Sequence, residues 1–186
     1  MAAFTHDWWI AYWWYLALLA GAAAERFLEL VISRRNLGWA LAHGGREEGI
    51  GHFPAMVALH SALGVACVLE PLLAPRPFLP ALGITAVVLV LASQALRYWC
   101  ILTLGHRWNT RIVVVPGLPL VRRGPYRFLS HPNYVAVALE GIALPLVFTS
   151  WVTAVAFTVL NAVLLLRFRI PAEEAAMSRA LAESRS

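Results

Sequence analysis

The chain has 186 residues, of which 60% are hydrophobic and 13% are charged, and its mean hydropathy is +0.68. Soluble domains carry about 25% charged residues, and disordered chains are poor in apolar and aromatic residues, so the composition excludes both classes. All 15 basic residues are arginine, against 10 acidic residues, which gives a net charge of +5. In so apolar a chain this excess indicates the cytoplasmic side of a membrane protein, and we expect no nucleic-acid partner.

The first half of the chain predicts three membrane-spanning helices, since a helix needs about 20 apolar residues to cross a bilayer. The first run, Trp8 to Ala24, contains no charge and is rich in tryptophan, which is typical of an interfacial aromatic belt. We expect its helix to continue to about Arg35. The second and third runs are Phe53 to Leu69 and Phe78 to Leu96.

The second half predicts two further spans. The run from Pro132 to Leu166 holds a single charged residue, Glu140, and is too long for one span. We expect two short spans with a turn at Thr149 to Trp151, or else one tilted span over Gly141 to Leu166. The predicted fold class is an all-α integral membrane protein with about five transmembrane helices. Residues 1–186 form a single membrane domain, divided into a three-span region (1–104) and a cofactor-binding region (105–186).

The placement of arginine predicts the orientation in the membrane. Every arginine except Arg76 follows the first, third or last predicted span. Because arginine concentrates on the cytoplasmic side, we expect the N-terminus outside and the C-terminus in the cytoplasm. Both long connections and the tail then face the cytoplasm, and polar chemistry is expected there.

The most informative segment runs from Gly105 to Tyr134, GHRWNTRIVVVPGLPLVRRGPYRFLSHPNY. It is too polar to lie in lipid, and its prolines and glycines rule out a continuous helix and produce a series of turns. Irregular backbone near a membrane is tolerated only where it is buried in protein or lines a wet cavity. We therefore expect this segment to pack against the bundle and to form a cofactor pocket at the cytoplasmic surface.

Two motifs resemble the isoprenylcysteine carboxyl methyltransferase (ICMT) family of integral-membrane enzymes, which use S-adenosylmethionine. The family's pattern is G-x-Y, then R-H-P-x-Y, then two spans, then R-x-x-x-E. The similar segments of this chain are GPYRFLSHPNY, an apolar hairpin and RFRIPAEEAAM. The resemblance covers about Arg107 to Met177. The front half, with ERFLELVISRRN and GHFP, is similar to the bacterial branch found beside polyketide synthases that make alkylresorcinols and alkylpyrones.

The resemblance implies a set of site residues. Arg169 matches the family's substrate-side arginine, and Glu173, with Glu174 beside it, matches a cofactor-binding glutamate. Ser130 replaces the arginine that usually precedes His-Pro, and Ala136 replaces a common glycine, so the charge and the closeness of approach differ at that turn. The other residues expected to bind the cofactor are Leu118, Pro119, Leu120, Val121, Tyr126, His131, Pro132, Asn133 and Tyr134.

The chemistry of S-adenosylmethionine agrees with these residue types. Its ammonium needs an anion such as Glu173 or Glu174, and its carboxylate needs arginine or backbone N–H donors. Its flat or cationic parts suit the rings of Tyr126 and Tyr134. Methyl transfer is an in-line displacement that depends on alignment in a dry site, so no nucleophilic residue is required.

The acceptor decides whether a base is needed. A carboxylate is already ionised at pH 7 and needs only positioning, for which Arg169 would serve. A phenol has a pKa of about 10 and needs a base such as Glu140 or His106. The absence of lysine suits a GC-rich bacterial genome, and together with the bacterial-branch resemblance it favours a phenolic or pyrone lipid of the bacterial cytoplasmic membrane. Arg169 and Glu140 are thus the expected catalytic residues.

Other interpretations remain open at this point. His131 could cap a helix, Arg169 and Glu173 could form a surface ion pair, and Glu140 could hydrogen-bond a neighbouring helix. The activity could also be carboxyl methylation of an isoprenylcysteine-like substrate or NADPH-dependent reduction of the sterol type, or the protein could be a non-catalytic scaffold. Cys67 and Cys100 lack metal-ligand spacing, so no metal is predicted. The sequence does not predict the oligomeric state.

Overall fold

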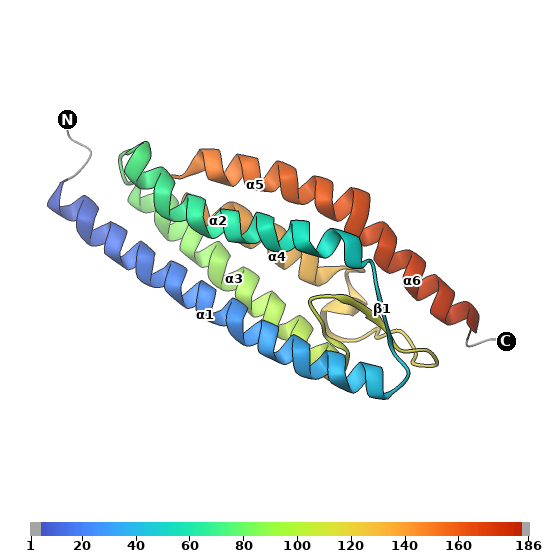
Figure 1. The fold of residues 1–186 in the computed structure, drawn as a ribbon. Coiled ribbons are helices and arrows are strands. Elements are labelled where there is room, and N and C mark those ends of the chain that lie inside the picture. The colour runs from blue at the N-terminus through green and yellow to red at the C-terminus, as the bar shows by residue number, and fades with distance from the viewer. Residues whose placement is uncertain (1–4, 184–186) are drawn as a thin grey trace.

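The computed structural model describes residues 5–183. Helices make up most of these residues, as the apolar runs predict. They lie side by side in an elongated bundle, and the two ends of the chain lie at opposite ends of it (Figure 1). The helices are α1 (His6–Ala42), α2 (Phe53–Leu73), α3 (Pro80–Leu104), α4 (Pro132–Leu146), α5 (Trp151–Leu164) and α6 (Ile170–Glu183).

Three stretches of the described residues are long and apolar enough to cross a membrane: Ile50–Leu73, Pro80–Arg107 and Trp151–Glu183. Helix α1 has 37 residues, but its apolar start is rich in tryptophan and tyrosine and its second half is charged. Helix α4 has 15 residues, fewer than the roughly 20 that a span requires. The structure therefore agrees with an integral membrane protein, and five crossings stay a prediction.

Helices α4 and α5 form a hairpin. Pro145 lies in the last turn of α4, and at Thr149 the backbone turns with a left-handed φ of 58° before α5 begins at Trp151. The turn lies where the sequence predicts it, and the alternative of one tilted span is wrong. The two helices approach closely, because a Cβ atom at Gly141 would lie 2.0 Å from the ring of Phe157.

The helical backbone continues beyond Leu164, the last residue of α5. A π-helical segment, Leu165–Arg169, joins it to α6, so that one continuous helix runs over Trp151–Glu183. A π segment holds one more residue in its turn than an α-helix and so rotates the residues that follow it. The helix face that packs on the bundle therefore changes at Arg169, whose side chain is buried.

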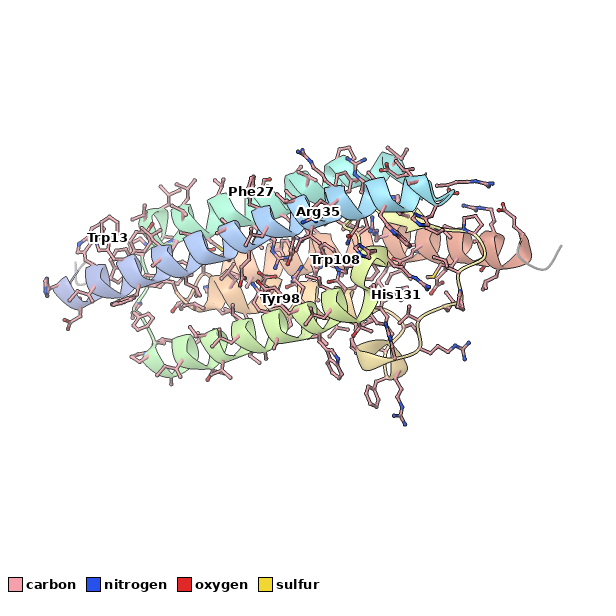
Figure 2. The ribbon with its side chains drawn as sticks, turned by 90° about the horizontal axis from the view of Figure 1, so that it is seen from below. Trp13, Phe27, Arg35, Tyr98, Trp108 and His131 are labelled. Atoms are coloured by element: carbon pink, nitrogen blue, oxygen red, sulfur yellow. The ribbon has the colours of Figure 1, made fainter. Side chains whose placement is uncertain are left out.

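Aromatic side chains close the N-terminal end of the bundle. Trp8 stacks on Tyr12 with 5.1 Å between the ring centroids, and both rings contact Phe148 of the α4–α5 turn. Trp8 is therefore a core residue, whereas Trp13 is 66% exposed, as the predicted aromatic belt requires. Figure 2 shows Trp13 at one end of the bundle and His131 at the other.

A two-stranded sheet is the one departure from the all-helical prediction among the described residues. Strands β1 (Arg46–Glu48) and β2 (Ile112–Val114) are antiparallel, with Glu48 opposite Ile112. The valine-rich run of β2 has high β propensity, and each strand satisfies backbone groups of the other. The sheet ties the α1–α2 connection to the proline-rich segment at the end of the bundle nearest His131 (Figures 1 and 2).

Candidate functional site

The segment between α3 and α4 packs against α1, as its composition predicts. Asn36 on α1 donates from its side-chain amide to the carbonyl oxygens of Trp108, at 2.6 Å, and Gly105, at 3.1 Å. Ser33, one turn earlier, donates to Asn109 at 2.8 Å. These contacts satisfy carbonyl groups outside the α-helices, which is the condition for irregular chain near a membrane.

The centre of the candidate site is Tyr134, in the first turn of α4. Its hydroxyl donates to Glu173 of α6 and accepts a bond of 2.9 Å from Nε of Arg169. The same guanidinium donates to the carbonyl oxygen of Thr110 at 2.9 Å. Arg169 is 5% exposed. The structure thus brings the two family motifs, which are far apart in sequence, into one hydrogen-bonded cluster.

The π segment explains how Arg169 and Glu173 reach Tyr134. Single π turns within α-helices occur frequently at functional sites, because they aim side chains where a regular helix cannot. Arg169 is the last residue of this segment and is buried, so the alternative of a surface ion pair with Glu173 is wrong. The Tyr134 hydroxyl bridges the two side chains instead.

The His-Pro-Asn-Tyr turn starts α4. Pro132 occupies the first turn and is buried, and His131 holds the N-cap position without a side-chain cap bond, so capping does not explain this histidine. Its ring stacks on Tyr134 at 5.3 Å, and its Nε2 lies 3.3 Å from Glu174. Oδ1 of Asn133 is buried and finds no hydrogen-bond partner within residues 5–183, which marks it as an acceptor for a bound group.

Tyr126 lies between α3 and this cluster. It belongs to the short helix η3 (Gly124–Arg127), and its phenol interacts with the thiol of Cys100 on α3. Burial, followed by the interaction with Cys100 and the charge of Glu173, raises the pKa of Tyr126 well above its ordinary value. The phenol is therefore neutral at physiological pH and offers a ring and a polar edge next to Glu173.

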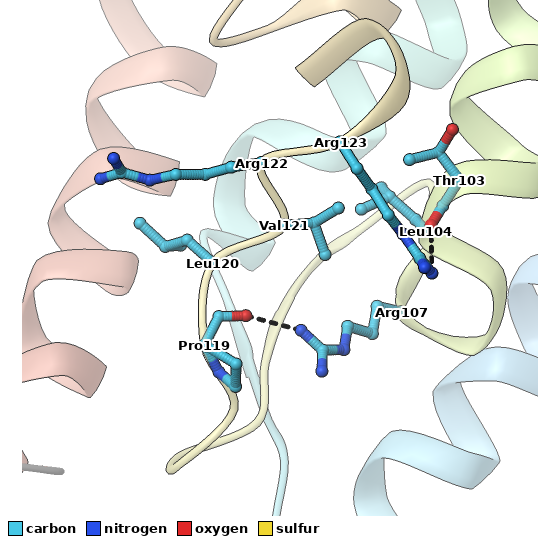
Figure 3. A pocket seen from close by; sticks show the side chains of 8 residues that line it. All are labelled: Thr103, Leu104, Arg107, Pro119, Leu120, Val121, Arg122 and Arg123. Atoms are coloured by element: carbon cyan, nitrogen blue, oxygen red, sulfur yellow. Dashed lines mark hydrogen bonds between the residues drawn. The ribbon is translucent and has the colours of Figure 1, made fainter. Parts of the chain in front are cut away.

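A hollow of about 440 Å³ opens beside the loop (Figure 3), within the range of about 300–1,000 Å³ typical of small-molecule sites. Three of the four expected wall residues line it, whereas Leu118 does not. Arg107 donates to the carbonyl oxygen of Pro119 at 2.7 Å and so ties this loop to the end of α3. The lining residues are Thr103, Leu104, Arg107, Pro119, Leu120, Val121, Arg122 and Arg123.

Glu140 lies apart from the Tyr134 cluster, in a network of polar side chains between α1, α3 and α4. Its Oε2 accepts bonds from Arg97 at 2.5 Å and from Arg26 at 2.7 Å, and Gln94 lies 3.5 Å from its other oxygen. Arg26 also pairs with Glu29 at 2.5 Å. Donors from α1 and α3 contact both oxygens of Glu140, so the geometry favours the helix-to-helix role over that of a base.

Sequence reasoning missed four residues around the site. Arg107, Arg122 and Arg123 have no role in the sequence prediction, although a Pro-Leu-Val-Arg-Arg run before Gly-Pro points to a polar loop. Thr110 contributes only its backbone oxygen, for which no side-chain signal exists. Among the described residues, no group of His, Cys, Asp and Glu side chains has the arrangement of a metal site.

Comparisons with known proteins agree with these motifs. The model of the isoprenylcysteine carboxyl methyltransferase (ICMT) family matches residues 86–179, which include η3, the Tyr134 turn, the hairpin and Glu173. The uncharacterized protein YpbQ of Bacillus subtilis (strain 168) is 38% identical over 167 residues, which cover 89% of this chain and 96% of YpbQ.

An uncharacterized protein of Haemophilus influenzae (strain ATCC 51907 / DSM 11121 / KW20 / Rd) is 28% identical over 162 residues, which cover 87% of this chain and 93% of that protein. No solved structure matches the chain. The motifs, the apolar helices and the family match agree along the C-terminal half, and the similarity to YpbQ extends over nearly the whole chain. The chain belongs to the ICMT family of integral-membrane methyltransferases, whose members use S-adenosylmethionine.

Proposed function

We propose that this protein transfers a methyl group from S-adenosylmethionine to the hydroxyl of a long-chain lipid in the bacterial cytoplasmic membrane. The observation that carries the proposal is the Tyr134 hydroxyl, which links buried Arg169 to Glu173. This cluster sets a cation and an anion side by side. Two opposite charges held by one phenol suit a cofactor that itself carries an ammonium, a sulfonium and a carboxylate.

The residues present fit the cofactor. The orphaned oxygen of Asn133 accepts a hydrogen bond from an amine or hydroxyl, and Glu173 and Glu174 supply anions for the ammonium. Tyr126 and Tyr134 supply aromatic rings, and the loop of Pro119 to Val121 supplies an apolar wall. When bound, S-adenosylmethionine supplies an electrophilic methyl group on sulfur.

The chain's own residues then bind the two reactants, orient them and exclude water from the site. Arg169 is fixed by the Tyr134 hydroxyl and the Thr110 carbonyl, so its guanidinium holds one orientation toward an acceptor oxygen. Such positioning accounts for most of the acceleration of a displacement in which opposite charges neutralise. A carboxylate acceptor would use the same guanidinium, and carboxyl methylation is therefore the second candidate.

The membrane arrangement is part of the proposal. The N-terminus outside, the C-terminus in the cytoplasm and five crossings are supported by the arginine bias and by the opposite positions of the two chain ends (Figure 1). The site residues lie at the end of the bundle that carries the sheet, which would then be the cytoplasmic end. A water-soluble cofactor would reach the site from the cytoplasm, and the acceptor and the surrounding lipids are the expected partners.

The test uses the full chain in detergent with methyl-labelled S-adenosylmethionine and a lipid extract of its host, with identification of the labelled product by mass. Label on a phenolic or enolic hydroxyl supports the proposal, and label on a carboxyl group replaces it with the second candidate. Binding and turnover of NADPH in place of the methyl donor would refute both. Glu173→Gln should lose cofactor binding, whereas Glu183→Gln on the same helix, where the side chain is 46% exposed, should not.

A further inference from the structure

His52 holds a polar atom that the site so far leaves unexplained. It ends the short helix η1 (Ile50–His52), directly before α2, within the GHFP motif. Its Nε2 is buried, and no partner for it exists in the described part of the chain. A buried polar atom without a partner is destabilising, so in a native structure such an atom generally serves a ligand or a bound water.

The imidazole of His52 is seated next to strand β2. Gly49 adopts a left-handed φ of 63°, and a Cβ atom there would lie 2.6 Å from Cε1 of His52 and 3.0 Å from the side chain of Ile112. Glycine alone admits the ring at this point. The ring is thereby held against the strand that follows Thr110.

Arg169 contacts the segment directly before this strand. Its guanidinium donates to the carbonyl oxygen of Thr110, two residues before Ile112, at 2.9 Å. The unpartnered nitrogen of His52 and the fixed guanidinium of Arg169 thus belong to side chains that both lie against the segment from Thr110 to Ile112.

The other charged groups on the elements around His52 are already paired. Glu47 of β1 accepts from Arg111, directly before β2, at 2.7 Å, and Glu48 of β1 accepts from Arg179 of α6 at 3.0 Å. Neither carboxylate is a hydrogen-bond partner of the imidazole in the described residues. The ring is thus left to bind a group that comes from outside the chain.

We propose that His52 is the base that takes the proton of the acceptor hydroxyl, with Arg169 stabilising the oxygen that becomes negative. The inference rests on the proposed function and replaces Glu140 in the role of base. As the acceptor oxygen bonds to the methyl carbon, the carbon–sulfur bond breaks and its electron pair stays on sulfur. The hydroxyl proton moves to Nε2 of His52 and later leaves to water.

This role follows from the needs of a phenolic acceptor. A phenol with a pKa of about 10 is almost entirely protonated at pH 7, and a positioned base contributes about 10²- to 10⁴-fold to the rate. Both oxygens of Glu140 already contact donors, whereas Nε2 of His52 has no partner within residues 5–183. A carboxylate acceptor would have no need for His52.

The experiment compares His52→Gln and His52→Asn with wild type. His43→Gln is the matched control. His43 directly follows α1, and its ring bonds the backbone oxygen of Trp39 in that helix, at 2.7 Å. We expect the His52 variants to bind S-adenosylmethionine like wild type and to lose about 10²- to 10⁴-fold in methyl transfer to a long-chain phenol. The loss should diminish as the pH approaches about 10, where the phenol ionises without a base.

A second measurement does not depend on turnover. A long-chain nitrophenol, whose ionised form absorbs visible light, should bind to wild type with a larger ionised fraction at neutral pH than it has on His52→Gln. Wild-type transfer by the His52 variants, or an unchanged spectrum of the bound nitrophenol, overturns the role of His52. Failure of wild type itself to bind S-adenosylmethionine would instead overturn the proposed function.

Discussion

The replacement Tyr134→Phe removes one oxygen and tests the centre of the proposed site. That oxygen donates to Glu173 and accepts from Arg169 at 2.9 Å, so both of its bonds involve ionised groups. Hydrogen bonds to charged groups contribute about 1.5–3 kcal/mol each. If the fixed orientation of Glu173 accounts for one such bond to the cofactor, the loss is about 10- to 150-fold in affinity at about 1.4 kcal/mol per tenfold.

The assay is equilibrium titration of the detergent-solubilised protein with labelled S-adenosylmethionine. Tyr98→Phe is the matched control, since the Tyr98 hydroxyl is exposed and bonds Glu25, at 3.2 Å, away from the site. Tyr134→Phe should weaken binding and Tyr98→Phe should not. Wild-type affinity in a folded Tyr134→Phe protein would show that the Tyr134 cluster does not organise the cofactor site.

Three further predictions concern stability and ionisation. Glu140→Ala leaves two guanidinium groups without their shared carboxylate and should destabilise the protein by about 3–5 kcal/mol, measured by thermal unfolding in detergent; an unchanged midpoint would contradict the helix-to-helix role. Gly141→Ala drives a methyl group into Phe157 and should cost about 1–3 kcal/mol in the same measurement, whereas Gly38→Ala, with no neighbour within 4 Å, should not destabilise. The raised pKa of Tyr126 means that folding keeps its phenol protonated. This contribution to stability is complete below the unfolded pKa of about 10 and is lost as the pH rises through the folded one. The difference in absorbance between wild type and Tyr126→Phe should therefore show no tyrosinate where exposed tyrosines ionise, and a normal titration of this residue would refute the burial.

The molecule contains two separate groups of interacting charged side chains. The Arg26, Arg97 and Glu140 network ties α1 to α3 and α4 inside the bundle, where charges persist only when paired. The Tyr134 cluster lies at the end of the bundle and leaves polar atoms of Asn133 and His52 without partners in the described chain. The first system pairs its carboxylates with guanidinium groups of neighbouring helices, and the second leaves polar atoms suited to a ligand.

Much of the site could be predicted from sequence because the chemistry lies in two compact motifs. His131 to Tyr134 stand next to one another, and Arg169 and Glu173 are four residues apart, so each motif carries its residue types whatever the rest of the chain does. The apolar runs likewise predict the helices, and Pro145 with the polar turn at Thr149 predicts the hairpin. Composition and local order decide these features, and both can be read without knowing which helices are neighbours.

Only the tertiary structure determines which groups the polar side chains contact. The sequence shows Glu140 as an unpaired acid within a span, and only the fold supplies Arg26 and Arg97 from two other helices. His52 lies in a predicted connection, and only the fold places it against Ile112 of β2. The π segment, which turns Arg169 inward, has no signature in the residue pattern. The physical reason is that a charged or polar side chain takes its function from the group it meets, and that meeting depends on contacts between segments far apart along the chain.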